Sequence, residues 1–391
     1  MTEATPPATK SPAVAQVRLT RPHRVGREEE YIARVLASPM WHGDGEFTRR
    51  ADAWLRELTG APAVLTTPSC THALELAAIL LDLGPGDEVI CPSFTFTSTA
   101  TAIAIRGATP VFVDVRPDTL NLDVSLVEAA ITERTRAVFV VHYGGIAADI
   151  DRLVALTEAR GLHLVEDNAH GLGGYWNGRH LGTFGGLATQ SFHDTKNLTS
   201  GEGGALLIND ESLRGRAEVV REKGTDRSSF LRGEVDKYTW QDVGSSFLMS
   251  EVSAALLVAQ SEGFEVMQAR RHEVWDRYAE QLAPWAADVG ATTMVVPEGN
   301  DHPAHVYYVL MPSADDQPGL MAHTGAREVT TVFHYQPLDS SPAGRRLGRT
   351  PHPCTVTRDV ASRIVRLPLH PGLSEDDVER VVDAVTSYRP A

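Results

Sequence analysis

The chain has 391 residues, of which 42% are apolar and 22% charged, and its formal net charge is −15. This length and composition are typical of a protein with about two domains and a sizeable core. The acidic balance argues against a nucleic-acid partner, which needs clustered positive charge. Three scattered cysteines are too few for a disulfide framework or a zinc cage. No run is long enough to span a membrane and the start lacks a signal-peptide pattern, so we expect a cytoplasmic protein.

Short apolar runs alternate with helical patterns after a proline-containing start, residues 1–16, which we expect to be a flexible tail. The alternation predicts helices over 71–83, 98–107, 125–132 and 149–161, and strands over 88–93, 110–115, 136–143 and 162–169. Nearly continuous apolar strands separated by helices are typical of a mainly parallel sheet that is covered on both faces.

The second half of the chain follows a different pattern. The runs 189–193 and 204–210 have no room for a helix between them, so we predict a hairpin-like antiparallel pair. Residues 249–285 predict a long helical bridge, and the remainder, with 305–311, 327–335 and a helix over 374–388, predicts a smaller α/β unit. We therefore expect a large domain over 17–255 and a linking helix with a small C-terminal domain over 256–391.

Several common chemistries are excluded by their missing motifs. No lysine follows a glycine, so there is no phosphate-binding loop of the GxxxxGK[ST] type, and no GxGxxG sequence is complete. The sequence also lacks a GxSxG elbow, an HExxH pair and a Cys/His set with metal-ligand spacing. We therefore expect no metal site.

Lys196 is one of only four lysines among 36 basic residues, so arginine supplies nearly all of the positive charge. Only lysine carries a primary side-chain amine that can lose its proton and form a Schiff base with a carbonyl. The scarcity makes Lys196 a candidate catalytic residue, although a leftover surface lysine would give the same count.

Other candidate site residues lie near the ends of predicted strands, where open α/β sheets bind ligands. Ser69, Cys70 and Thr71 precede a helix and could bind a phosphate with their backbone amides, or simply form a helix cap. Asp167 ends an apolar run and could pair with a ring nitrogen, or cap a turn. Two rings, Phe96 and His170, could contact a planar cofactor but are individually more typical of structural residues.

Together these residues match one cofactor. Pyridoxal phosphate needs a Schiff-base lysine, a phosphate cup, an aromatic ring partner and an acid for its pyridinium nitrogen. The sequence also resembles the DegT/DnrJ/EryC1/StrS family of sugar-nucleotide aminotransferases from about residue 18 onward, and within it the TDP-4-oxo-6-deoxyglucose 4-transaminases. The motifs that carry the resemblance are GDGEFTRR (43–50), TPSCTHALE (67–75), PGDEVICPSFTFTSTA (85–100), VFVDVRPDTLNLD (111–123), VEDNAHG (165–171), SFHDTKN (191–197), residues 221–251 and VFHYQPL (332–338).

The resemblance implies a fold-type-I α/β protein, with a large, mainly parallel mixed-sheet domain and a smaller C-terminal α/β domain. It places Lys196 on the Schiff-base lysine, Asp167 on the pyridinium partner, Phe96 on the aromatic that covers the ring and Ser191 on a phosphate contact.

His170 falls near the 3-hydroxyl of the ring, and the backbone amide of Cys70 replaces that of a frequent glycine. Ser246 stands where relatives have an asparagine that reaches the phosphate of the neighbouring subunit, so the resemblance implies a homodimer with shared active sites.

For the reaction, the resemblance implies transfer of an amino group from L-glutamate to C4 of TDP-4-keto-6-deoxy-D-glucose, with pyridoxamine phosphate as intermediate. Lys237, His334 and Tyr335 are candidate contacts to the sugar nucleotide. Asp339 and His170 depart from the residues of galacto-forming relatives, and both are expected near the sugar, so the galacto and gluco products both stay open.

Three alternatives remain at this point: amino transfer at C3 of another keto sugar, a sugar dehydratase, and a non-catalytic regulator. Dehydratases of the family have histidine in place of lysine, and Lys196 argues against that alternative.

Overall fold

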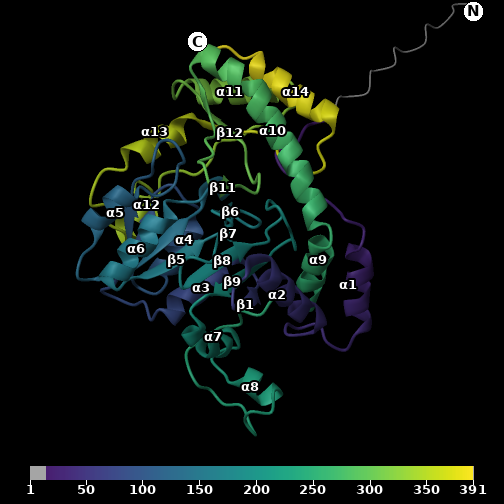
Figure 1. The fold of residues 1–391 in the computed structure, drawn as a ribbon, viewed down its shortest axis with the longest axis vertical. Coiled ribbons are helices and arrows are strands. Elements are labelled where there is room, and N and C mark those ends of the chain that lie inside the picture. Colours follow the sequence, from purple (N-terminus) through teal and green to yellow (C-terminus); the bar gives the residue numbers. More distant parts are fainter. Residues whose placement is uncertain (1–14, 391) are drawn as a thin grey trace, which may run out of the picture.

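The computed structural model describes residues 15–390, so most of the predicted tail, residues 1–14, lies outside the described residues. Its centre is a seven-stranded sheet with the order β1-β9-β8-β5-β4-β2-β3 (Figure 1). Its strands are β1 (Ala63–Thr67), β2 (Glu88–Pro92), β3 (Thr109–Val113), β4 (Thr135–Val141), β5 (His163–Asp167), β8 (Leu187–Ser191) and β9 (Gly204–Ile208). Only β9 among these seven runs antiparallel to its neighbours. The predicted mixed, mainly parallel sheet is confirmed.

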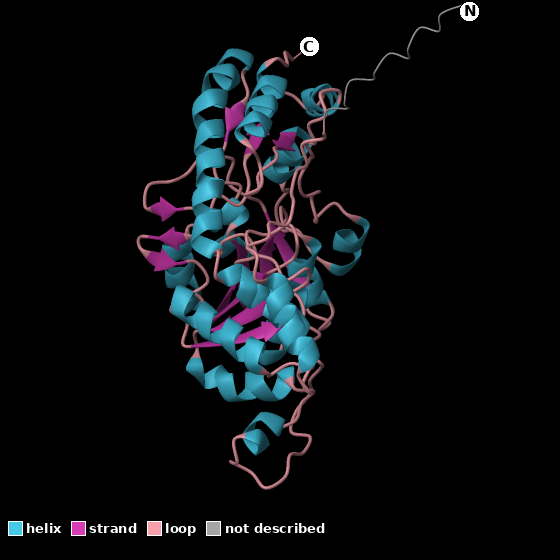
Figure 2. Cartoon of the chain, turned by 90° about the vertical axis from the view of Figure 1, so that its right-hand side faces the viewer, coloured by secondary structure: helices cyan, strands magenta, loops and turns pink. Residues whose placement is uncertain are grey.

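Helices cover both faces of this sheet, as the continuously apolar strands predict. Along β2, Val89 and Cys91 pack in one core cluster with the helices of one face, and Ile90 packs in another on the opposite face. The helices of the sheet region are α1 (Glu28–Ala37), α2 (Glu46–Thr59), α3 (Cys70–Leu80), α4 (Thr97–Ala104), α5 (Val124–Ala130), α6 (Ile150–Arg160), α7 (Arg214–Arg221) and α9 (Glu251–Ser261), with short 3-10 turns at Tyr143–Gly145 and Glu211–Leu213. Figure 2 shows the strands enclosed between these helices.

The long helix α10 (Phe264–Val289) leads away from the large sheet to a second unit at one end of the molecule (Figure 1). It has a three-stranded sheet, ordered β10-β12-β13, and its own core cluster, which includes Tyr278, Val309 and Val381. Its elements are β10 (Thr292–Thr293), β12 (Tyr308–Leu310), α11 (Asp316–Gly325), α13 (Thr355–Arg363), β13 (Ile364–Arg366) and α14 (Glu375–Thr386). The short helix α12 (Pro342–Leu347) instead packs against β3 of the large sheet. A further small sheet joins β6 (Tyr175–Trp176), β7 (Arg179–His180) and β11 (Asn300–Asp301).

Local chemistry explains why several helices begin where they do. Ser69 and Ser250 cap α3 and α9 because each side chain accepts a hydrogen bond from a backbone N–H of the first turn. α2 has a glycine at its N-cap instead, and its first turn donates to the carboxylate of Glu251, with N–O distances of 2.8 Å from Phe47 and 2.9 Å from Thr48. A carboxylate suits this position because the helix dipole is positive there.

The sequence prediction differs from the structure at several elements. The helical region 249–285 is two helices, α9 and α10, separated at Glu262 and Gly263. The run 327–335 forms no strand and makes only isolated bridges at Val329 and Val332. Strand β1 and helices α1 and α2 were not predicted. The boundary at residue 255 stays a prediction.

An arm, residues 222–250, projects from the far end of the large sheet and carries the short helix α8 (Arg227–Leu231) (Figure 1). It exposes large apolar side chains, among them Leu231 and Trp240, which is 79% exposed. Within residues 15–390, no helix is both long enough and apolar enough to cross a membrane.

Candidate active site

A cavity of about 590 Å³ opens at the carboxyl ends of the parallel strands. Ten of the predicted site residues line it: Ser69, Cys70, Thr71, Phe96, Asp167, His170, Ser191, Lys196, His334 and Tyr335. They come from five separate parts of the chain, and the strand order of the sheet brings them together. The volume is sufficient for a ligand of cofactor size.

The first turn of α3 forms one wall of the cavity. Ser69 Oγ accepts from the backbone N–H of His72, 3.2 Å away, and so caps the helix. The N–H groups of Cys70 and Thr71 are at the first two helical positions, where no carbonyl within the helix can reach them. Both residues line the cavity, so these donors and the positive end of the helix are available to an anion. Ser69 is therefore a helix cap that also lines the cavity, and its role at an anion site stays a prediction.

Gly204 is essential to the shape of this wall. A Cβ placed there would lie 2.3 Å from the backbone N of Cys70 and 2.4 Å from the carbonyl carbon of Ser69. Strand β9 therefore passes directly behind the cup, and only glycine permits that approach. On the neighbouring strand, Ser191 presents a hydroxyl that has no hydrogen-bond partner among the described residues.

Lys196 lies in the loop between β8 and β9, in a turn closed by its own N–H to the carbonyl of His193. Burial lowers the pKa of its amine to about 8, because the interior disfavours the charged form. An amine with this pKa is partly neutral near physiological pH and can act as a nucleophile or base.

Asp167 ends β5 and is 4% exposed. Its Oδ2 accepts a 2.7 Å hydrogen bond from Thr99 Oγ1, and its Oδ1 accepts one from the N–H of Ala169 at 3.3 Å. Burial raises the pKa of the carboxyl group, while these hydrogen bonds and the charge of Lys196 act in the opposite direction. A cationic partner in the cavity would restore the ionised form.

Stacked rings form the wall opposite α3. His170 and His305 stack at 4.3 Å, and His334 and Tyr335 stack at 3.8 Å between ring centres. His170 Nδ1 accepts from the N–H of Gly144, so its Nε2 carries the proton and donates to the hydroxyl of Tyr335, 3.1 Å away. Burial holds the pKa of all three histidines well below its usual range, so this wall is neutral.

Phe96 and Cys70 complete the predicted cofactor contacts. Phe96 is 57% exposed at the cavity, with its ring centre 6.2 Å from that of Tyr335. Burial raises the pKa of the Cys70 thiol, which donates to Thr189 Oγ1. The thiol therefore stays protonated, and only the backbone amide of Cys70 is suited to bind an anion.

Two predicted residues do not line this cavity. Ser246 and Lys237 are exposed on the arm, far along the chain from the cavity wall. Asp339, expected near the sugar, lies outside the cavity wall as well: its carboxylate accepts a 2.7 Å hydrogen bond from Ser93 and pairs with Arg358. The hydrogen bond from Ser93, which directly follows β2, therefore holds the segment after Tyr335 against the end of that strand.

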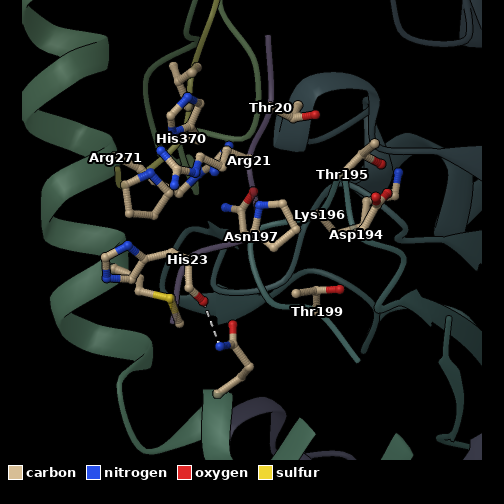
Figure 3. Close-up of a pocket in the computed structure, with 15 residues that line it drawn as sticks. Thr20, Arg21, His23, Asp194, Thr195, Lys196, Asn197, Thr199, Arg271 and His370 are labelled. Atoms are coloured by element: carbon tan, nitrogen blue, oxygen red, sulfur yellow. Dashed lines mark hydrogen bonds between the residues drawn. The ribbon is translucent and has the colours of Figure 1, made fainter. Parts of the chain in front are cut away.

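Residues 194–197 of the loop that carries Lys196 also line a second, much smaller pocket (Figure 3). Its volume of about 10 Å³ suits at most one water molecule. Arg271 lines it and donates to the carbonyls of Ala304 and His305, and Gln260 fixes the carbonyl of His23 at 2.7 Å. The residues around this part of the lysine loop therefore leave little empty space.

Several residues of the site were not found in the sequence. Thr99 orients Asp167, Asn197 accepts from His305 at 2.8 Å, and Tyr143 bonds His334 at 2.6 Å. Arg366 also lines the cavity. None of these has a sequence pattern of its own. Only Asn197 could have been suspected from the sequence, because it directly follows Lys196.

The sequence model of the DegT/DnrJ/EryC1/StrS aminotransferase family matches residues 23–386. The chain belongs to this family. It is 32% identical over 374 residues to the spore coat polysaccharide biosynthesis protein SpsC of Bacillus subtilis (strain 168), covering 92% of this chain and 94% of that protein. Among solved structures it resembles the aminotransferase TlmJ from Streptoalloteichus hindustanus, with a TM-score of 0.87, 32% identity and coverage of 95% and 98% of the two chains. It also resembles the putative sugar aminotransferase Spr1654 from Streptococcus pneumoniae in its PLP form, with a TM-score of 0.87, 26% identity and coverage of 95% and 98%.

These likenesses confirm the fold-type-I aminotransferase fold, and pyridoxal phosphate is the cofactor of this aminotransferase. The residues that line the cavity also fit pyridoxal phosphate chemically. The free amides of α3 and the unpartnered hydroxyl of Ser191 suit a phosphate, Lys196 supplies a reactive amine, and Asp167 supplies a buried acid. Within residues 15–390, no group of three or more His, Cys, Asp or Glu side chains is arranged to hold a metal ion.

Proposed function

We propose that this aminotransferase transfers the amino group of L-glutamate to C4 of TDP-4-keto-6-deoxy-D-glucose and gives a TDP-4-amino-4,6-dideoxyhexose. The observation that carries amino transfer is the placement of Lys196 and Asp167 in one cavity with the α3 cup. The 4-keto sugar substrate is supported by the subgroup motifs at 221–251 and 332–338. The sugar class is also supported by the likeness to a putative sugar aminotransferase.

Each residue has a distinct task. The amides of Cys70 and Thr71 would hold the phosphate of the cofactor, and Lys196 would hold its carbonyl carbon. Bound pyridoxal phosphate supplies a ring that accepts the electrons left when a carbon loses its proton. Asp167 would keep the ring nitrogen protonated, because an opposite charge at hydrogen-bond distance favours the cationic form. Thr99 would keep that carboxylate in place.

Lys196 would also move protons. Its pKa of about 8 allows the free amine to take the α-proton of glutamate and, in the second half of the cycle, to deliver a proton to C4 of the sugar. The neutral wall of His170, His334 and Tyr335 faces the same cavity. This wall would contact the sugar by hydrogen bonds without competing for the proton that Lys196 carries.

We also propose that the active protein is a homodimer in which the arm of each subunit completes the site of the other. Ser246 and Lys237 are on the exposed arm and not in the cavity of their own chain. Their predicted roles as cofactor and substrate contacts would therefore be met in the partner subunit.

The test uses the visible absorbance of the cofactor bound to the purified protein. Added L-glutamate should bleach the band, and TDP-4-keto-6-deoxy-D-glucose should then restore it. Lys196→Ala should lose both the band and turnover, with Lys10→Ala, in the predicted tail, as the control that keeps them. No bleaching of the wild-type protein by glutamate would contradict the proposed donor. Recovery only with a 3-keto sugar would favour the C3 alternative.

The configuration at C4 is the next measurement. The coupling constants of the C4 proton in the product, read by NMR, distinguish an axial amine (galacto) from an equatorial one (gluco). The face that Lys196 protonates depends on how the sugar lies in the cavity, so this result also fixes the orientation of the sugar.

A further inference from the structure

Arg366 is a half-buried cation whose Nε atom is fully buried and whose backbone is firmly held. It is the last residue of β13 and pairs with Tyr308 on β12. Its N–H donates to the carbonyl of Val332 at 2.7 Å, and its own carbonyl accepts from Val332 at 3.2 Å. These bonds fix where the side chain begins, and the side chain lines the same cavity as Lys196.

The guanidinium of Arg366 differs from its neighbours in having no acceptor. Within residues 15–390 it makes no side-chain hydrogen bond or ion pair, and its Nε is buried without a partner. By contrast, Arg271 donates to two backbone carbonyls, and Arg363, three residues before Arg366, pairs with Asp359. A buried charge is normally paired because leaving it unpaired is costly.

The surroundings of Arg366 offer no negative charge. The groups whose pKa responds to its charge are tyrosines, histidines, Lys196 and Arg271, none of which is an acid that is ionised at neutral pH. The nearby Tyr143 and His334 already bond to each other at 2.6 Å. Burial lowers the pKa of the Arg366 guanidinium, which remains charged because an arginine pKa starts so high. The cavity is therefore arranged to receive an anion at this point.

We propose that Arg366 binds the α-carboxylate of the amino donor. The inference rests on the proposed function, since it names how the same cavity holds its first substrate. A guanidinium matches a carboxylate with two parallel hydrogen bonds, and burial strengthens that pair. The α-carboxylate is one bond from the carbon whose proton Lys196 takes, so its partner must share the cavity with Lys196.

The diphosphate of the sugar nucleotide is the other anion that enters the site. It is attached at C1, across the sugar ring from the reacting C4. A cation that serves the diphosphate would therefore lie a full ring away from the atom that Lys196 reaches. Arg366 and Lys196 line the same cavity, which favours a carboxylate that is attached to the reacting carbon.

The experiment measures binding in the Lys196→Ala background, where no amino transfer occurs, by calorimetric titration of the cofactor-loaded protein. Two ligands are compared: L-glutamate, and 4-aminobutyrate, which is glutamate without its α-carboxylate. Arg366→Met should weaken glutamate binding about 10- to 100-fold, as expected for loss of a charge-assisted pair. It should leave 4-aminobutyrate unchanged. Arg363→Met is the matched control and should change neither.

Three outcomes overturn the proposal: unchanged glutamate binding, an equal loss for both ligands, or weakened binding of thymidine diphosphate with glutamate unaffected. The last would assign Arg366 to the diphosphate. Thermal unfolding separates binding from folding, because removal of an unpaired buried charge should leave the melting temperature equal or higher. Failure of the proposed function would show separately, as absent bleaching in the protein with Lys196 intact.

Discussion

At the residue scale, the decisive property of Lys196 is its environment. The amine of an exposed lysine has a pKa near 10.4, whereas burial lowers the pKa of Lys196 to about 8. The neutral fraction of an amine grows as pH rises through its pKa, so Lys196 becomes reactive at a lower pH than an ordinary lysine does. At pH 8 about half of the Lys196 amines would be neutral, against roughly 0.4% for an ordinary lysine.

This difference predicts selective labelling. In cofactor-free protein, modification of Lys196 by trinitrobenzenesulfonate should rise with a midpoint near pH 8. Peptide mapping by mass spectrometry at a series of pH values measures this midpoint. A midpoint near pH 10.4, the pKa of an ordinary lysine, would contradict the proposed environment of Lys196.

Thr99 holds the carboxylate of Asp167 in place by a hydrogen bond, so changes at either residue should lower the rate. We expect Asp167→Asn to lower kcat roughly 10²- to 10⁴-fold, because an amide cannot favour the protonated ring. Thr99→Val removes one hydrogen bond and should lower kcat by about tenfold. Thr101→Val, on an exposed position of the same helix, is the control. Full activity of Asp167→Asn would exclude this residue as the ring partner.

At the element scale, the site depends on how closely β9 approaches the first turn of α3. The approach is possible because Gly204 has no side chain, and it places the free amides of the helix beside Ser191. The antiparallel β9 thus has a role that its apolar sequence does not indicate: it sets the floor of the anion site.

Gly204→Ala should therefore displace the cup. The added methyl group would lie 2.3 Å from a backbone nitrogen, and backbone cannot yield as a flexible side chain can. We expect at least a tenfold loss of pyridoxal phosphate affinity together with about 1–3 kcal/mol of stability, as is usual for overpacking. Gly186→Ala, whose Cβ would have no neighbour closer than 3.7 Å, is the control. Fluorescence titration with the cofactor and thermal melts measure the two effects, and normal cofactor affinity in Gly204→Ala would refute the argument.

At the scale of the whole molecule, the arm extends away from the hydrophobic cores that stabilise the rest of the chain (Figure 1). Leu231, Tyr238 and Trp240 are each at least half exposed, a concentration of apolar surface that is typical of a contact with another protein. Ser246, on the same arm, is expected to reach the phosphate in a partner subunit.

The proposed dimer predicts a clear change of mass. In light scattering, the wild-type protein should have twice the chain mass of 42.4 kDa, and Trp240→Glu should shift it toward the monomer with loss of turnover. Val266→Glu, at a similarly exposed position on α10, should remain a dimer. A wild-type protein that is monomeric and fully active would contradict the shared site.

The sequence by itself determined six of the seven strands of the large sheet, all but β1, because the apolar pattern of a strand depends on neighbouring residues. It also predicted Lys196, Asp167 and the cup as cofactor residues, and the structure brings them into one cavity, while their roles stay predictions. Only the tertiary structure decided how β9 supports α3, that Asp339 is turned away from the cavity, and that Arg366 lies unpaired beside Lys196. These facts arise from contacts between segments far apart in the chain, where packing and burial decide which polar groups find partners.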